Sequence, residues 1–263
     1  MDKRPIGVFD SGVGGLSILR ELRQLLPNEN YVFLADQQHL PYGGKSERQI
    51  IDYSRRATTY LARQNIKLLV IACNTVTCYA KDALREKCPF PIIGTVPALK
   101  PAAEQTRSDS IAVLSTRATA RSKELKGLMR NFCQGVKVLN IGCPGLEKAV
   151  ENGKLNSVNT TFLLEQYLKK VKDSDVDYLV LGCTHYPFLK DAIREIAGPS
   201  IKILDSGAAI ARRAKALLKL NRFKNTQEKR GKISYFTTGD RNKFNIAASR
   251  LLQTKVSSKK IKI

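Results

Sequence analysis

Short apolar runs alternate along this chain with segments in which apolar residues recur every three or four positions. The runs predict parallel strands, because a strand covered on both faces reads as continuous Val, Ile and Leu, and the recurring pattern predicts amphipathic helices. Alternating strands and helices are typical of an α/β protein with a parallel sheet. We expect strands at residues 6–9, 31–35, 67–72, 91–94, 111–114, 136–141, 178–181, 201–204 and 233–237.

Two of the predicted strands end in a cysteine. The strand at 67–72 is followed by Cys73, and the strand at 178–181 is followed by Gly182 and Cys183. The carboxyl ends of parallel strands deliver side chains into a crevice, where α/β proteins bind their ligands. We therefore expect both thiols at the mouth of a crevice.

The first strand leads into a turn rich in glycine, Asp10-Ser11-Gly12-Val13-Gly14-Gly15, and then into a helix. This order makes an anion site, since the free N–H groups and the dipole at the start of the helix point at the turn. The turn does not match the Gly-x-Gly-x-x-Gly fingerprint, so it indicates a dinucleotide only weakly. A carboxylate would suit the turn equally well.

The order of strand, hydroxyl-bearing turn, helix, strand and cysteine occurs twice. Ser11 and Cys73 are 62 residues apart, and Thr116 and Cys183 are 67 residues apart. We therefore expect two similar three-layer α/β domains with parallel sheets, related by a pseudo-twofold axis. Such an arrangement would put the active site in the cleft between the domains, with one cysteine on either side.

Composition narrows the class of protein. With 263 residues, 43% of them hydrophobic, the chain can bury one large core or two modest ones. Its six cysteines include no Cys-x-x-Cys pair, and its N-terminus lacks the apolar core of a signal peptide, which favours free thiols in a reducing cytoplasm. Only two histidines, His39 and His185, argue against a zinc cluster, and no apolar run approaches the roughly 20 residues of a membrane-spanning helix. We expect no metal and no membrane partner.

The formal net charge is +22 and is concentrated toward the C-terminal end. From Ala211 to Ile263, 16 Lys and Arg residues oppose only Glu228 and Asp240, which leaves a net charge of +14. Basic segments attract nucleic acids and acidic membranes. No nucleic-acid module and no interleaving of aromatic with basic residues accompanies the charge, so we interpret it as a solvated surface. A basic nucleic-acid-binding protein that keeps the fold is the alternative from a different class.

A cysteine thiolate acts as a nucleophile in some sites and as a base in others, depending on its partners. Nucleophilic hydrolysis needs a histidine base, which Cys73 lacks nearby in the sequence, and disulfide exchange favours the absent Cys-x-x-Cys pair. Two thiols that follow equivalent strands of a repeated order suit the inversion of a stereocentre. In such a reaction one group removes a proton from one face and the other returns a proton to the opposite face. Asp10 near Cys73 and His185 near Cys183 would assist the two thiols.

Four motifs resemble those of the cofactor-independent glutamate racemases, in the aspartate/glutamate racemase superfamily. They are Val8–Leu16, Pro41–Gly43, Ala72–Thr75 and Leu181–Pro187, in this order over nearly the whole chain. The resemblance implies a cytoplasmic homodimer that interconverts L- and D-glutamate without a cofactor and supplies D-glutamate to peptidoglycan precursors. It also implies that the C-terminal segment completes the first domain, so that residues 1–97 plus 208–263 form one domain and residues 98–207 the other.

The resemblance also assigns roles to individual residues. Cys73 and Cys183 would be the two bases, acting on D-glutamate and L-glutamate respectively. Asp10 and His185 would assist them, joined by Glu151 in a predicted short helix. The substrate-binding residues would be Asp10, Ser11, Pro41, Tyr42, Gly43, Cys73, Asn74, Thr75, Thr116, Cys183, Thr184 and His185.

Departures from the family pattern leave questions open. The family often has Gly-Asp-Thr-Ala-Arg before Pro-Tyr-Gly, whereas this chain has Ala35-Asp36-Gln37-Gln38-His39, so the roles of Gln37, Gln38 and His39 are open. The residues after Cys143-Pro144 also lack the bulky apolar character of the family. These residues do not indicate the length of the substrate side chain. A racemase of another acidic amino acid, such as aspartate, is therefore the nearest alternative.

Overall fold

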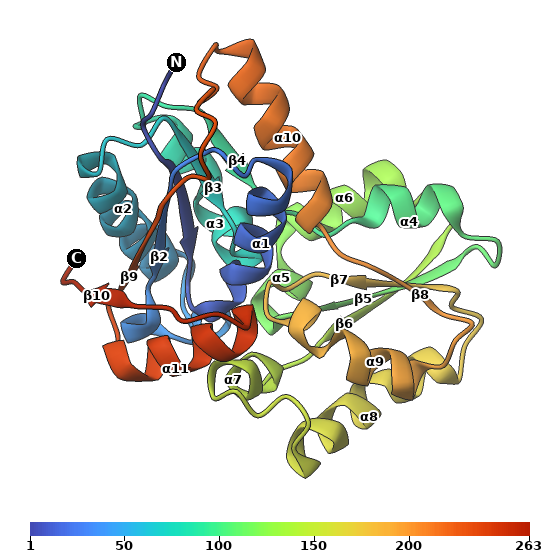
Figure 1. The fold of residues 1–263 in the computed structure, drawn as a ribbon. Coiled ribbons are helices and arrows are strands. Elements are labelled where there is room, and N and C mark those ends of the chain that lie inside the picture. The colour runs from blue at the N-terminus through green and yellow to red at the C-terminus, as the bar shows by residue number, and fades with distance from the viewer.

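Two parallel sheets flanked by helices make up the computed structural model, which describes residues 1–263 (Figure 1). The first sheet has the strand order β10-β9-β2-β1-β3-β4, and the second has the order β6-β5-β7-β8. Neighbouring strands pair in parallel throughout. The strands are β1 (Ile6–Asp10), β2 (Tyr31–Ala35), β3 (Leu68–Ile71), β4 (Ile92–Gly94), β5 (Ser110–Ser115), β6 (Lys137–Gly142), β7 (Tyr178–Leu181), β8 (Lys202–Leu204), β9 (Ile233–Thr237) and β10 (Ser258–Lys260).

Helices cover both faces of each sheet. They are α1 (Leu16–Leu25), α2 (Glu47–Arg63), α3 (Asn74–Arg85), α4 (Leu99–Gln105), α5 (Arg117–Arg121), α6 (Lys123–Phe132), α7 (Leu146–Glu151), α8 (Val158–Lys172), α9 (Lys190–Ala197), α10 (Gly207–Leu220) and α11 (Arg241–Leu252). The first sheet packs between α2 and α3 on one face and α1, α10 and α11 on the other. The second packs between α4 and α6 on one face and α7, α8 and α9 on the other. The predicted fold class is confirmed.

The repeat seen in the sequence is a repeat of topology. The order β2-β1-β3-β4 in the first sheet matches the order β6-β5-β7-β8 in the second. Strands β1 and β5 therefore occupy equivalent places, and so do β3 and β7. Cysteines follow both members of the second pair, so the two thiols occupy equivalent positions in the two sheets.

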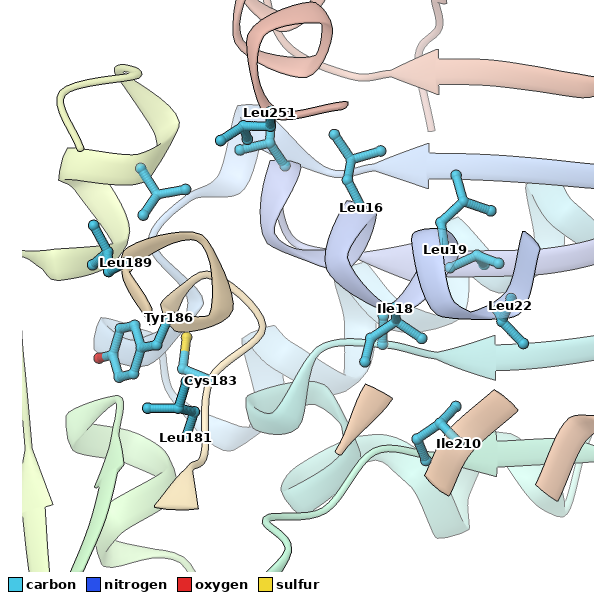
Figure 2. Close-up of a cluster of buried hydrophobic side chains, with 14 of the residues drawn as sticks. Leu16, Ile18, Leu19, Leu22, Leu181, Cys183, Tyr186, Leu189, Ile210 and Leu251 are labelled. Carbon is cyan, nitrogen blue, oxygen red and sulfur yellow. The ribbon is translucent and has the colours of Figure 1, made fainter. Parts of the chain in front are cut away.

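One apolar cluster joins the two sheets. Helix α1 contributes Leu16, Leu19 and Leu22, and the end of β7 contributes Leu181 (Figure 2). Each of these side chains is almost completely buried, and such burial stabilises the fold by roughly 1.5–3 kcal/mol per leucine. The shared cluster therefore fixes the glycine turn before α1 against the Cys183 end of β7.

The C-terminal segment extends the first sheet. Strand β9 pairs with β2, and β10 pairs with β9. The sequence did not predict β10, because Ser258–Lys260 is short, contains two lysines and has no apolar run. Its pairing depends on β9, which tertiary structure supplies. The domain limits at residues 97 and 208 stay a prediction.

The basic residues of the C-terminal segment are divided among several elements. Arg212 and Arg213 lie on α10, Arg241 and Lys243 lie on α11, and further lysines follow in β10. Helices α10 and α11 lie at opposite ends of the first sheet (Figure 1). The charge is thus spread over distant parts of the surface. None of the helices combines the length and the apolar character that crossing a membrane requires.

Candidate active site

Two buried cysteines lie at equivalent ends of the two sheets. Cys73 follows β3 and precedes α3, and Cys183 follows β7. Both side chains line one pocket. The pocket is also lined by Ser11, Leu40, Pro41, Tyr42, Gly43, Asn74, Thr75, Thr116, Glu147, Thr184 and His185.

The structure brings together all residues predicted to bind substrate except one. Asp10 does not line the pocket but lies next to it, where its carboxylate contacts the lining residue Thr184. Leu40 and Glu147 line the pocket although the sequence did not single them out as site residues. No motif marks Leu40, and Glu147 lies one helical turn before Glu151 in α7.

Cys73 lies among hydroxyl and apolar groups. Its Sγ is 3.5 Å from the hydroxyl oxygen of Ser11. Burial raises the pKa of the Cys73 thiol to about 12, and the charge of Asp10 adds to this rise. Cys73 is therefore protonated at neutral pH and can give a proton.

Cys183 lies at one end of a chain of polar contacts. Its Sγ is 3.7 Å from Nδ1 of His185, and Nε2 of His185 is 2.7 Å from Oε1 of Glu151. Gln37 donates through Nε2 to the other oxygen of Glu151 at 2.6 Å. This chain of contacts, Cys183–His185–Glu151–Gln37, is called the thiol relay below.

The thiol relay changes the protonation of its members. Burial opposes a charge on His185, but the hydrogen bonds to Cys183 and Glu151 outweigh it and hold the pKa of the imidazole well above its ordinary value. Burial raises the pKa of Cys183, and the hydrogen bond to His185 counteracts that rise. Cys73 has no imidazole partner, so only Cys183 has a cationic group to stabilise its thiolate.

The glycine turn binds a carboxylate from the protein itself. The Val13 N–H donates to Oε1 of Glu151 at 2.7 Å. A Cβ atom on Gly12 would collide with the Glu151 carboxylate, and one on Gly14 would lie 2.5 Å from Nδ1 of His185. The two glycines allow this close approach, and in the structure the Glu151 carboxylate occupies the anion-binding position of the turn.

Asp10 is completely buried beside the pocket. It accepts hydrogen bonds from the Gly12 N–H at 2.9 Å and from the Thr184 hydroxyl at 3.1 Å. Burial raises the pKa of Asp10 to about 6, although the nearby His185 lowers it. Asp10 can therefore exchange a proton near neutral pH, which suits a group that assists proton transfer.

The structure gives contacts to two of the three loop residues whose roles the sequence left open. Gln37 bridges Glu151 to the hydroxyl of Thr237, which donates to Oε1 of Gln37 at 2.9 Å. His39 lies 2.8 Å from a carboxylate oxygen of the buried Asp36. The Gln38 side chain is exposed, and only its backbone N–H makes a hydrogen bond. No sequence signal could identify the bridge of Gln37, because Thr237 comes from β9.

Asp36 also holds the Pro41–Gly43 wall of the pocket. It accepts hydrogen bonds of 2.6 Å from the hydroxyls of Tyr42 and Thr238. Next to this wall, where Thr116 lies against Gly43, the Thr75 hydroxyl is 3.0 Å from that of Thr116, which links the two sheets. The wall and the hydroxyl pair are therefore fixed by contacts between distant segments.

The pocket is closed and lacks basic side chains other than His185. Its open volume is about 20 Å³, far below the roughly 300–1,000 Å³ of ordinary ligand pockets. An amino acid can enter only if the surrounding elements move apart. No three His, Cys, Asp or Glu side chains are grouped so that they could hold a metal ion.

Known proteins resemble this chain in sequence and in structure. The sequence profile of the Asp/Glu/Hydantoin racemase family matches residues 6–214. The glutamate racemase of Herpetosiphon aurantiacus is 42% identical over 91% of this chain and 94% of its own length. The crystal structure of glutamate racemase isoform RacE1 from Bacillus anthracis has a TM-score of 0.92 at 30% identity, over 100% of this chain and 99% of its own. The Escherichia coli glutamate racemase, in complex with L-glutamate and the activator UDP-MurNAc-ala, has a TM-score of 0.84 at 32% identity, over 95% of this chain and 94% of its own.

These similarities confirm the resemblance that the four sequence motifs indicated. They also confirm the prediction of an isomerase of the amino-acid racemase type, because the relatives that match over nearly their whole length are named as such enzymes. Since a family profile covers most of the chain and a 42% identical relative covers nearly all of it, this chain belongs to the Asp/Glu/Hydantoin racemase family.

Proposed function

We propose that this protein is a glutamate racemase that interconverts L- and D-glutamate with two cysteine bases and no cofactor. The observation that carries the proposal is that Cys73 and Cys183 come from equivalent strand ends and line the same pocket. Glutamate as substrate is supported by the relatives, which are glutamate racemases, one of them in complex with L-glutamate.

The proposed reaction removes a proton from one face of the α-carbon and adds a proton to the opposite face. The Cys183 thiolate takes the α-proton of L-glutamate, and the electron pair of the broken C–H bond stays on the carbon as a planar carbanion. The Cys73 thiol gives its proton to the opposite face, which forms D-glutamate and leaves a thiolate on Cys73. The reverse reaction exchanges the two roles.

Neighbouring groups support this assignment of roles. The Cys73 thiol, whose pKa is raised to about 12, carries a proton at neutral pH that it can give to the carbanion. The imidazolium of His185 stabilises the Cys183 thiolate, and Glu151 holds that imidazolium in place. Asp10 accepts or returns a proton beside the two thiols. The assignment of Cys73 to D-glutamate and of Cys183 to L-glutamate in the proposed scheme is the one that the resemblance to the family implies.

The remaining lining groups suit an amino acid with two carboxylates. Hydroxyls, the Asn74 amide and backbone N–H groups can bind carboxylates without a lysine or arginine that would trap a thiolate beside it. No lysine lines the pocket to form an imine. Because the closed pocket has no room for an amino acid, binding is proposed to include opening and closure, which excludes water from the carbanion.

The wider role is part of the same proposal. We place the enzyme in the cytoplasm as a homodimer, where its D-glutamate supplies peptidoglycan precursors. The closest competing function is racemisation of aspartate, which would use the same pair of thiols.

The test is exchange of the α-hydrogen in heavy water. Purified protein should exchange the α-hydrogen of both enantiomers of glutamate with deuterium and bring either one to a racemic mixture. Exchange of the α-hydrogen of aspartate, but not of glutamate, would show that aspartate is the substrate. If neither amino acid exchanges, the two-base proposal fails.

A further inference from the structure

One carboxylate in the pocket has no partner. Glu147 in α7 lines the same pocket as both thiols, and its Oε2 is shielded from solvent without any hydrogen bond. The other buried side-chain atoms that lack a partner are the hydroxyl oxygens of Ser54, Thr58 and Thr95. Glu147 is thus the one carboxylate in the structure with a buried and unpartnered oxygen.

An ionised oxygen in this state is costly. Burying a polar group without a hydrogen bond costs free energy, and the cost is greater for a charged group. No lysine or arginine lines the pocket, and the one imidazole, His185, already contacts Cys183 and Glu151. The protein itself therefore supplies no cation for Glu147, and a ligand that carries one would remove the cost.

The other carboxylates at the site are already engaged. Asp10 accepts hydrogen bonds from Gly12 and Thr184 and does not line the pocket. Glu151 accepts from Val13 and Gln37 and contacts His185. Among the acidic side chains of the site, only Glu147 both lines the pocket and has a free oxygen.

The charge of Glu147 also acts on the proposed base. After burial, which is the larger cause, the negative charge of Glu147 raises the pKa of Cys183. A positively charged group bound at Glu147 would offset this effect, because opposite charges nearby favour the thiolate. A ligand cation at this place would therefore make the base easier to ionise when substrate is bound.

We propose that Glu147 binds the α-ammonium group of the amino-acid substrate through its free carboxylate oxygen. The inference rests on the proposed function, in which the substrate is an amino acid whose α-carbon lies between the two thiols. The ammonium is the only cation that glutamate carries, and it is attached to that carbon. Glu147 then distinguishes an amino acid from a dicarboxylate of the same length that lacks the ammonium.

The experiment compares two ligands with two proteins by calorimetry. The ligands are DL-glutamate, whose composition racemisation does not change, and glutarate, which has the same two carboxylates but no ammonium. The proteins are the wild type and Glu147→Gln, which keeps the size of the side chain and removes its charge. Lys148→Gln is the matched control, because it changes the charge of the next, exposed residue.

We expect Glu147→Gln to weaken the binding of DL-glutamate by about 10- to 100-fold, as for loss of a hydrogen bond to a charged group. Glutarate should bind the variant as well as or better than the wild type, and Lys148→Gln should change neither ligand. An unchanged affinity for glutamate, or an equal weakening of both ligands, would overturn the inference.

A second measurement separates recognition of the ammonium from a structural role. In the pH profile of kcat/KM for L-glutamate, Glu147→Gln should shift the titration of the base to lower pH, because the charge that raises the pKa of Cys183 is gone. An unchanged pH profile would contradict the effect of the Glu147 charge on the pKa of Cys183. If the wild type binds glutamate without exchanging its α-hydrogen, the proposed function fails while the binding comparison still decides the role of Glu147.

Discussion

The two cysteine sites have the same position in their sheets but different surroundings. Cys73 and Cys183 follow equivalent strands, β3 and β7. The one side-chain hydrogen bond of Cys73 is to the hydroxyl of Ser11, whereas Cys183 contacts the imidazole of His185 in the thiol relay. The repeated backbone therefore provides two thiols at equivalent positions, and the local side chains give only one of them, Cys183, an imidazole partner.

The difference sets the resting state of the proposed enzyme. The pKa of Cys73 is about 12, so its proton stays bound at neutral pH. The raised pKa of His185 puts a positive charge beside Cys183. Of the two thiols, only Cys183 thus has a positive charge beside it, which favours the thiolate that the proposed proton abstraction needs.

The largest effect is expected from removing either thiol. Cys73→Ala and Cys183→Ala should each abolish racemisation, because each leaves one face of the α-carbon without an acid or base. Conversion of one glutamate enantiomer into the other, followed by chiral chromatography, measures this. Cys88→Ala is the control, since Cys88 lies outside the pocket. Full activity in either of the first two variants would rule out the two-base scheme.

A smaller but still large effect is expected from breaking the thiol relay at its centre. His185→Asn should reduce kcat by about 10²–10⁴-fold, with a smaller change in KM. The base titration in kcat/KM for L-glutamate should move to higher pH, because the hydrogen bond from His185 opposes the rise in the pKa of Cys183. His39→Asn, the control, should leave that titration in place. A His185→Asn profile identical to the wild type would contradict the role of the relay.

Asp10 lies between the two sites and should limit stability as pH rises. Its pKa is raised from 3.8 to about 6 in the folded protein, so the folded state holds the proton more tightly than the unfolded state. Stability linked to Asp10 is therefore complete below pH 3.8 and is lost as the pH rises through about 6. The shift corresponds to about 3 kcal/mol at most.

Asp10→Asn removes this titration and keeps the size of the side chain. Denaturant unfolding should show the variant to be more stable than the wild type at pH 8 by on the order of 1–3 kcal/mol, with a smaller difference at pH 4. Its racemase activity should be strongly reduced. A stability difference that does not depend on pH would show that the Asp10 pKa is not raised in the folded protein.

The smallest effect is expected at the outer end of the thiol relay. Gln37→Ala removes the donor to Glu151 and should reduce kcat by about tenfold, the size of one hydrogen bond to a charged group. The loss should be accompanied by a shift in the pH profile on the Cys183 side. Gln38→Ala is the matched control, since the Gln38 side chain is exposed and makes no hydrogen bond. Equal activities of the two variants would show that Gln37 does not contribute to the thiol relay.

Local patterns in the sequence were sufficient for much of the fold. Apolar runs marked the strands β1 to β9, and the doubled order of turn and cysteine anticipated the matching strand orders of the two sheets. The exception was β10, whose two lysines give no apolar run and whose partner is a tertiary neighbour. Residue spacing also led to the two thiols, to Asp10 and to His185, because each lies at the end of a recognisable strand.

The sequence by itself determined the strand ends, the glycine turn and the pair of thiols, since each depends on residues close together in the chain. Only the tertiary structure decided that the turn binds Glu151, that Gln37 holds the same carboxylate, and that Glu147 lines the pocket without a partner. Val13 and Glu151 are 138 residues apart, and Gln37 and Glu151 are 114 residues apart. Contacts over such distances depend on how the two sheets pack against each other, which no local pattern encodes.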